Sequence, residues 1–168
     1  KLFSYRRIGY SGNILKPLLK HSFICPSTVM MRKSVFDSIG GFDKDFRDAE
    51  DWDLWRRLAC QGILFGYIDK PLVHTRLHIS SLSGFHNQVR MKKMNLLSFE
   101  KMFEKMTPQE RVEYDMVGIL KNLKLKLAIA HLLLGEKKEF RYWLKKSKKW
   151  HWPFVYILSW LPSELVSF

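Results

Sequence analysis

The sequence predicts an α/β segment over residues 1–84, followed by an α-helical region over residues 85–168. In the first segment, short apolar runs typical of strands alternate with short helical stretches, and glycine or proline stands between them. From Phe85 onward, apolar residues recur at helical spacing instead. The 168 residues are 46% hydrophobic, which is sufficient for a folded core.

Helices and strands should alternate along the first segment. In order, we expect a short helix at 14–19, a strand at 23–31, helices at 35–39 and 49–61, and extended runs at 63–68 and 71–77. Ser34 and Asp48 are placed to cap the two later helices, because their side-chain oxygens can accept hydrogen bonds from free N–H groups. The pair Gly40-Gly41 and then Gly62 should end these helices, since glycine takes the left-handed backbone conformation readily.

The second region should consist of three helices, near 85–105, 108–134 and 136–149. Pro108 suits a first helical turn, and Gly135 suits a helix end. An apolar stripe is mainly a packing signal, and it runs through Leu120, Leu123, Leu127, Ala128, His131 and Leu134. The tail over 151–168 is aromatic and is interrupted by two prolines.

Charge and composition narrow the possible partners and compartments. The net charge of +13 suits an anionic partner, such as a nucleotide diphosphate, an anionic membrane surface or a nucleic acid. Cys25 and Cys60 form neither a CxxC pair nor a zinc-like cluster, so a reducing, cytoplasmic compartment is expected. We find no apolar run long enough to span a membrane and no secretory signal, and we therefore expect a soluble or peripheral protein that begins inside a larger one.

Residues 27–58 carry the most informative pattern. Hydroxyl residues in a predicted strand are followed by a short helix, by the turn Gly40-Gly41-Phe42-Asp43 and by the helix start Glu50-Asp51-Trp52-Asp53-Leu54-Trp55-Arg56. In order and spacing, residues 9–84 resemble the second half of inverting family-2 glycosyltransferases. The resemblance implies that residues 1–84 are the acceptor-side, C-terminal half of a GT-A (Rossmann-like) domain, with 85–168 as a helical extension.

That resemblance implies an activity as well. A sugar would pass from a nucleotide-sugar donor to a hydroxyl of a saccharide or lipid-linked acceptor, with inversion, in the biosynthesis of cell-envelope polysaccharide or glycolipid. The attacking hydroxyl must lose its proton, and a carboxylate can act as the general base. By resemblance Asp51 is that base and Glu50 positions the acceptor, whereas two carboxylates at a helix start can also simply cap the helix. Further expected substrate-binding residues are Ser27, Thr28, Gly41 and Trp52.

The segment Arg76-Leu77-His78-Ile79-Ser80-Ser81-Leu82-Ser83 resembles the part of the family that closes over the nucleotide diphosphate. Arg76, Ser81 and Ser83 would then contact phosphate oxygens, and His78 would bind either phosphate or a divalent metal, Mg or Mn. Alternatively, His78 is an exposed loop histidine. The resemblance places most metal ligands in a donor-binding half that residues 1–22 do not supply, so the chain is expected to be a fragment that is inactive alone.

Two Asp-x-Asp patterns, at 43–45 and 51–53, are not expected to be the family's metal motif. In the family this motif ends an apolar strand earlier in the chain, whereas these two follow a glycine turn or open a helix.

The basic and aromatic C-terminal end leaves its role open. Basic residues crowd 137–149, and tryptophan and other aromatic residues follow them. This combination can dock a helix on an anionic bilayer, or the aromatic residues can pack on the helices as a cap. Two rival classes are a nucleic-acid-binding module and a helical interaction protein. No nucleic-acid-binding motif is found, so no nucleic acid is expected as a partner.

Overall fold

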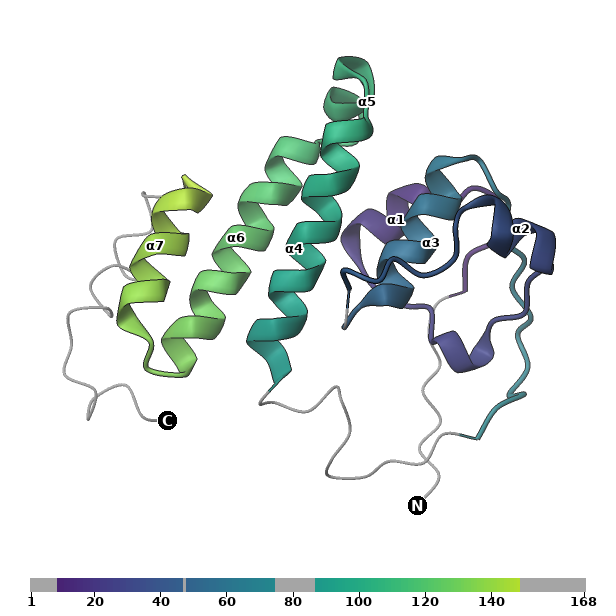
Figure 1. The fold of residues 1–168 in the computed structure, drawn as a ribbon, viewed down its shortest axis with the longest axis horizontal. Helices are drawn as coiled ribbons and strands as arrows, with labels where there is room; N and C mark the ends of the chain where they lie inside the picture. The colour runs from purple at the N-terminus through teal and green to yellow at the C-terminus, as the bar shows by residue number, and fades with distance from the viewer. Residues whose placement is uncertain (1–8, 47, 75–86, 149–168) are drawn as a thin grey trace. The chain divides into compact units, whose positions relative to one another are not determined.

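The computed structural model describes residues 9–46, 48–74 and 87–148, and the chain divides into two compact units, 1–79 and 80–168 (Figure 1). The first unit holds α1 (Leu15–Lys20), the 3-10 turn η1 (Pro26–Thr28), α2 (Lys33–Ser38) and α3 (Glu50–Cys60). The second holds α4 (Gln88–Lys105), α5 (Pro108–Glu113), α6 (Met116–Leu133) and α7 (Lys137–Ser147).

The predicted α/β fold, with its GT-A (Rossmann-like) architecture, is wrong for the part of the chain that the structure describes. Helix makes up 63% of that part, and it contains no strand or sheet. The predicted strand at 63–68 forms a single antiparallel bridge, in which Gly12 and Phe65 exchange backbone hydrogen bonds of 2.7 and 3.0 Å. A strand needs a neighbour along its whole length, and this segment finds one at only one position.

The predicted strand at 23–31 contains the 3-10 turn η1 instead. Pro26 occupies the first position of this turn, and proline has a fixed φ and no N–H to offer a strand ladder. The backbone N–H of Thr28 donates to the Cys25 carbonyl at 2.9 Å, and the Thr28 hydroxyl donates to the same oxygen at 2.7 Å. These local bonds satisfy groups that a sheet would otherwise use.

The helix predictions are largely confirmed, and Gly40, Gly41 and Gly62 follow α2 and α3 with positive φ as expected. The predicted N-caps are not confirmed. α1 and α3 form where they were expected, Pro108 opens α5, and Gly135 follows α6 with φ 74°. α2 begins one residue before Ser34, and the capping position of α3 is Ala49 rather than Asp48.

The predicted helix over 108–134 is divided into α5 and α6 at Asp115. This residue has a left-handed φ of 48°, and its carboxylate accepts a hydrogen bond from Gly118 N at 3.2 Å, which caps the new helix. One continuous apolar pattern therefore covers two helices.

The first unit has its core between α1 and α3, which contact each other. The buried apolar residues of these elements are Ile14, Leu15, Leu18, Leu19, Leu54, Trp55, Leu58 and Ala59. Arg56 is also buried, and its Nε donates to the Leu18 carbonyl at 3.4 Å. The core therefore fixes the position of α3, which carries the Glu50-Asp51 pair.

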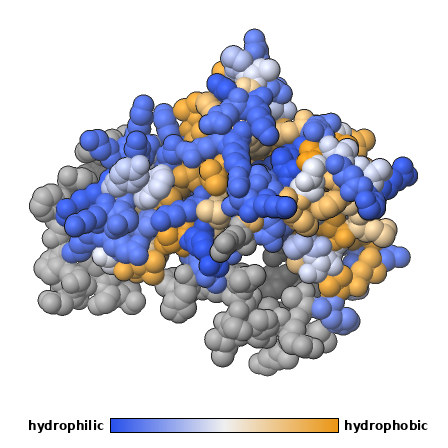
Figure 2. Space-filling model, viewed as in Figure 1, coloured by the Kyte–Doolittle hydropathy of each residue, from blue (hydrophilic) through white to orange (hydrophobic). Residues whose placement is uncertain are grey.

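The second unit is a helical assembly in which α6 contacts α4, α5 and α7. α6 and α7 share a cluster formed by Leu125, Ala128, Leu132, Phe140 and Leu144. At the turn between them, Nδ1 of the buried His131 pairs with the Glu136 carboxylate. Hydrophilic side chains dominate the visible face of this unit, with apolar patches along α6 (Figure 2). No helix in the described ranges is both long and apolar enough to cross a bilayer.

Candidate functional site

The Glu50-Asp51 pair opens α3 directly after a residue with a strained backbone. Ala49 is buried and has φ 64° and ψ 22°. These angles lie in the left-handed region of the backbone, which residues other than glycine seldom adopt. Such strain costs about 1–3 kcal/mol and is found most often at functional sites. Ala49 thus turns the chain sharply into the helix and places two carboxylates in its first turn.

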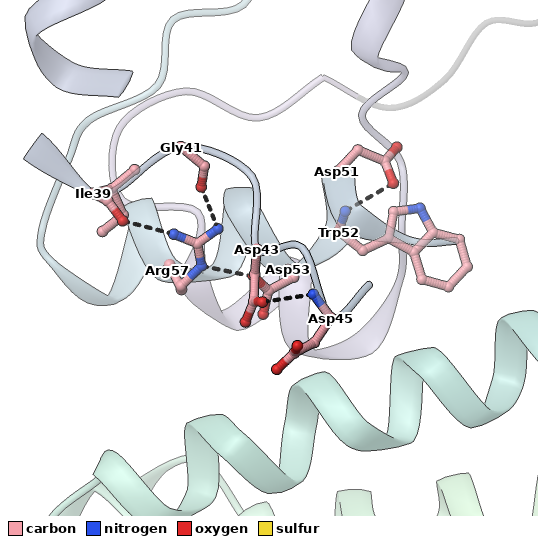
Figure 3. Close-up of polar contacts among 8 residues, drawn as sticks. All are labelled: Ile39, Gly41, Asp43, Asp45, Asp51, Trp52, Asp53 and Arg57. Carbon is pink, nitrogen blue, oxygen red and sulfur yellow. Dashed lines mark hydrogen bonds and ion pairs between the residues drawn. The ribbon is translucent and has the colours of Figure 1, made fainter. Parts of the chain in front are cut away.

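The Asp51 carboxyl is half-buried at this helix start. Its Oδ1 accepts a hydrogen bond from the Trp52 backbone N–H at 2.9 Å, and the Trp52 side chain lies next to it (Figure 3). Burial raises the pKa of Asp51 above its usual 3.8, the Trp52 N–H opposes this shift, and the negative charge of Glu50 adds to it. Burial therefore outweighs the hydrogen bonds in setting the pKa of Asp51.

A second carboxylate of the same turn has a structural role. The buried Asp53 accepts a hydrogen bond from Arg57 Nε at 2.7 Å, which forms an i,i+4 ion pair along α3. The two terminal nitrogens of Arg57 donate to the carbonyls of Ile39 and Gly41 at 2.8 and 2.7 Å (Figure 3). We call Arg57 with these three partners the Arg57 clamp. It fixes the Gly40-Gly41 turn against α3.

Gly41 belongs to the substrate-binding prediction, and the structure gives it a steric role. Its φ is 65°, it is buried, and a Cβ there would lie 2.9 Å from the Phe36 ring. Gly40 also has a positive φ, of 79°, but no atom lies within 4 Å of where its Cβ would be. Glycine is needed at 41 for both backbone and space, and at 40 for the backbone alone.

These two glycines give a matched pair of variants. We expect Gly40→Ala to destabilise the first unit by about 1 kcal/mol, since L-residues disfavour the left-handed conformation. Gly41→Ala should cost more, because the overlap with Phe36 adds to the same backbone penalty. Hydrogen exchange of the α3 amides measures both losses, and equal effects of the two variants would contradict the steric role of Gly41.

The other predicted site residues are only partly brought together. Trp52 lies beside Asp51, whereas Ser27 and Thr28 are exposed in η1 and make no hydrogen bond to Glu50 or Asp51. The nucleotide-binding prediction at Arg76, His78, Ser81 and Ser83 lies outside the described residues.

The resemblance places most metal ligands in a donor-binding half that residues 1–22 do not supply. The described residues by themselves do not form a metal site. They contain no group of three or more histidine, cysteine or acidic side chains that could hold a metal. Asp43 Oδ1 accepts a hydrogen bond from the Asp45 N–H at 3.0 Å, which is a local turn, and Asp53 is held in the Arg57 clamp. Within the described residues, these contacts give Asp43 and Asp53 structural roles.

Comparison with models of known protein families, with curated proteins and with solved structures gives one result. No match was found in any of the three. The family-2 glycosyltransferase resemblance therefore stays a prediction that rests on the residues quoted above.

Sequence reasoning missed the long-range contacts of the two arginines. Arg56 is buried, and burial lowers its pKa to about 9, a shift that the nearby Asp53 and Asp51 carboxylates oppose. The spacing of Arg57 to Asp53 is visible in the sequence, but the bonds to Ile39 and Gly41 depend on how the turn folds back.

Proposed function

We propose that the Glu50-Asp51 helix start is the acceptor end of a sugar-transferring site, in which Asp51 is the general base. The observation that most strongly supports this proposal is that the Asp51 carboxyl is half-buried and has a raised pKa. A raised pKa makes the carboxylate a stronger base towards a hydroxyl group. Asp51 also makes no ion pair within the described ranges, unlike Asp53, so it can receive a proton.

The chemistry that this arrangement supports is a single displacement. The acceptor hydroxyl gives its proton to Asp51 as its oxygen bonds to the anomeric carbon of the donor sugar. The bond from that carbon to the nucleotide diphosphate breaks, and the diphosphate leaves with the electron pair. Attack from the opposite face inverts the anomeric configuration. Glu50, on the same helix turn, can accept a hydrogen bond from a second hydroxyl of a saccharide or lipid-linked acceptor.

The donor side of this proposal depends on residues outside the described ranges. Arg76, His78, Ser81 and Ser83 are the proposed contacts to the nucleotide diphosphate. A divalent Mg or Mn ion would neutralise the charge of the leaving diphosphate. Its ligands would come mainly from a nucleotide-binding part that the described residues do not contain.

A transfer assay tests the proposal. We expect the complete gene product, given a panel of nucleotide-sugars and hydroxyl acceptors, to release nucleoside diphosphate and form a glycoside of inverted anomeric configuration. Nucleoside diphosphate release is measured enzymatically, and the configuration by proton NMR. A product of retained configuration, or no transfer with any donor of the panel, would count against Asp51 as a general base in single displacement.

We further propose that α7 contacts an anionic membrane surface at the cytoplasmic face, in keeping with the absence of a disulfide between Cys25 and Cys60. Phe140 and Leu144 of α7 are buried in the core, so its apolar face is already occupied. The exposed basic residues of α7 and its C-cap are Lys138, Arg141, Lys145, Lys146 and Lys148. Binding would therefore rest on charge attraction and not on inserting this helix, and salt should weaken it strongly.

Vesicle sedimentation tests this contact. We expect the protein to sediment with vesicles that contain phosphatidylserine at low salt and to remain in the supernatant at high salt. The double variant Lys138→Gln, Lys145→Gln should bind less tightly, by about 1 kcal/mol for each charge removed. Lys44→Gln, an exposed change in the first unit, is the control. Equal binding to neutral vesicles, or an equal loss in the control, would contradict the proposed surface.

A further inference from the structure

The second unit contains an open pocket between the start of α4 and the C-terminal half of α6. Its volume is about 320 Å³. The lining residues are Gln88, Val89, Lys92, Lys126, Ile129, Ala130, Leu133 and Leu134. All of them belong to these two helices except Leu134, which is the C-cap of α6, and the two helices contact each other (Figure 1). The pocket is therefore a feature of one packed helix pair.

The wall of this pocket is apolar and partly open to solvent. Val89, Ile129 and Ala130 contribute aliphatic surface, and the last two residues of the wall, Leu133 and Leu134, are 65% and 42% exposed. Contiguous exposed apolar surface that is also concave is typical of ligand sites. An aliphatic chain would cover this surface.

Two lysines give the pocket an uncompensated positive charge. Lys92 Nζ donates to the Gln88 side-chain oxygen at 2.7 Å, and neither Lys92 nor Lys126 pairs with an acidic group in the described ranges. In contrast, the nearby Lys124 pairs with Glu100 at 3.0 Å. Burial lowers the pKa of Lys92, and repulsion from Lys126 lowers it further. An anion placed between the two ammonium groups would relieve this repulsion.

We infer that this pocket binds a single-chain amphiphile, with its aliphatic chain on the Val89, Ile129 and Leu133 wall and its anionic head between Lys92 and Lys126. The apolar wall and the two lysines together favour an amphiphile over other ligands. The apolar wall does not suit a free phosphate or a nucleic acid, and the two unpaired cations do not suit a neutral hydrocarbon. The proposal is independent of sugar transfer, because no residue of the first unit takes part.

Calorimetric titration of the full chain with monododecyl phosphate, below its micelle concentration, tests the inference. We expect saturable binding of one molecule for each chain. Dodecyl maltoside, which has the same chain and a neutral head, should bind at least about tenfold more weakly, because it lacks charge-assisted contacts. Inorganic phosphate should not bind measurably. Shorter alkyl phosphates should lose about fourfold in affinity for each CH2 removed.

Matched lysine variants locate the head group. Lys92→Met with Lys126→Met should weaken dodecyl phosphate binding at least about tenfold and leave dodecyl maltoside binding unchanged. Lys93→Met is the control, since Lys93 is the exposed neighbour of Lys92 on α4 and does not line the pocket. An equal loss in Lys93→Met would show attraction by net charge alone and would overturn the inference.

A change at the exposed edge of the wall tests the position of the chain. Leu133→Glu should abolish binding of both amphiphiles, because a charge would replace the apolar contact. Leu133 is 65% exposed, so this variant should keep its helical circular dichroism. Retained binding of dodecyl phosphate in Leu133→Glu, or binding of inorganic phosphate as tight as that of dodecyl phosphate, would overturn the inference.

Discussion

Replacing Asp51 with asparagine is expected to lower kcat for sugar transfer by about a hundredfold to ten-thousandfold, the range that a general base contributes. Asparagine keeps the shape of the side chain and an oxygen that can accept the hydrogen bond from the Trp52 N–H, but it cannot take a proton. The KM for the nucleotide-sugar should change little, because Asp51 faces the acceptor in the proposed site. Steady-state kinetics of the complete gene product with both substrates measure the two constants.

The same variant should be more stable than the native protein at neutral pH. The folded-state pKa of Asp51 is raised, so the ionised carboxylate is less favourable in the folded chain than in the unfolded chain. This penalty is complete above the folded-state pKa and disappears as the pH falls through it towards the unfolded value of 3.8. Urea unfolding at several pH values measures the difference. Lost activity with unchanged or lower stability at pH 7 would point to damage of the fold instead of loss of a base.

Replacing Arg57 with methionine should lower the free energy of unfolding of the first unit by about 3 kcal/mol. The change removes the Arg57 clamp, so the buried Asp53 carboxylate loses its Arg57 partner, and the Ile39 and Gly41 carbonyls lose their charged donor. Native-state hydrogen exchange of the α3 amides measures the loss in this unit alone.

Two further variants separate the geometry of the Arg57 clamp from simple charge pairing. Arg57→Lys keeps the charge but not the planar fork, so part of the stability should still be lost. Lys33→Met breaks another i,i+4 pair, with Asp37, in which both side chains are more than half exposed. That loss should stay below about 0.5 kcal/mol. If Arg57→Met and Lys33→Met had equal effects on α3, the Arg57 clamp would have no special structural role.

The helices could be predicted from the sequence because their signals are local. Pro108 and Gly135 act through their own backbone preferences, and those preferences hold in the folded chain. Strands could not be predicted in the same way, because a strand is defined by its partner. Residues 63–68 have the composition of a strand, yet only Phe65 finds a backbone neighbour, at Gly12. The α/β prediction failed at this step.

Part of the candidate site could be predicted because the signal for a helix start is also local. Glu50 and Asp51 were expected at a helix start, and they open α3. The residue before them could not be identified as strained, because Ala49 does not favour a left-handed backbone by itself. Burial of Asp51 outweighs its hydrogen bonds in raising the pKa, and that burial depends on the tertiary fold and not on the local sequence.

The Arg57 clamp also has a consequence for the order of folding. Its two carbonyl bonds join residues that are 18 and 16 positions apart in the chain, so they close a short loop around Asp51. The entropy cost of closing a loop grows with its length, and contacts between residues close in sequence form early during folding. The contacts of Arg57 with Ile39 and Gly41 should therefore form earlier during folding than those between α1 and α3, which lie farther apart in the chain.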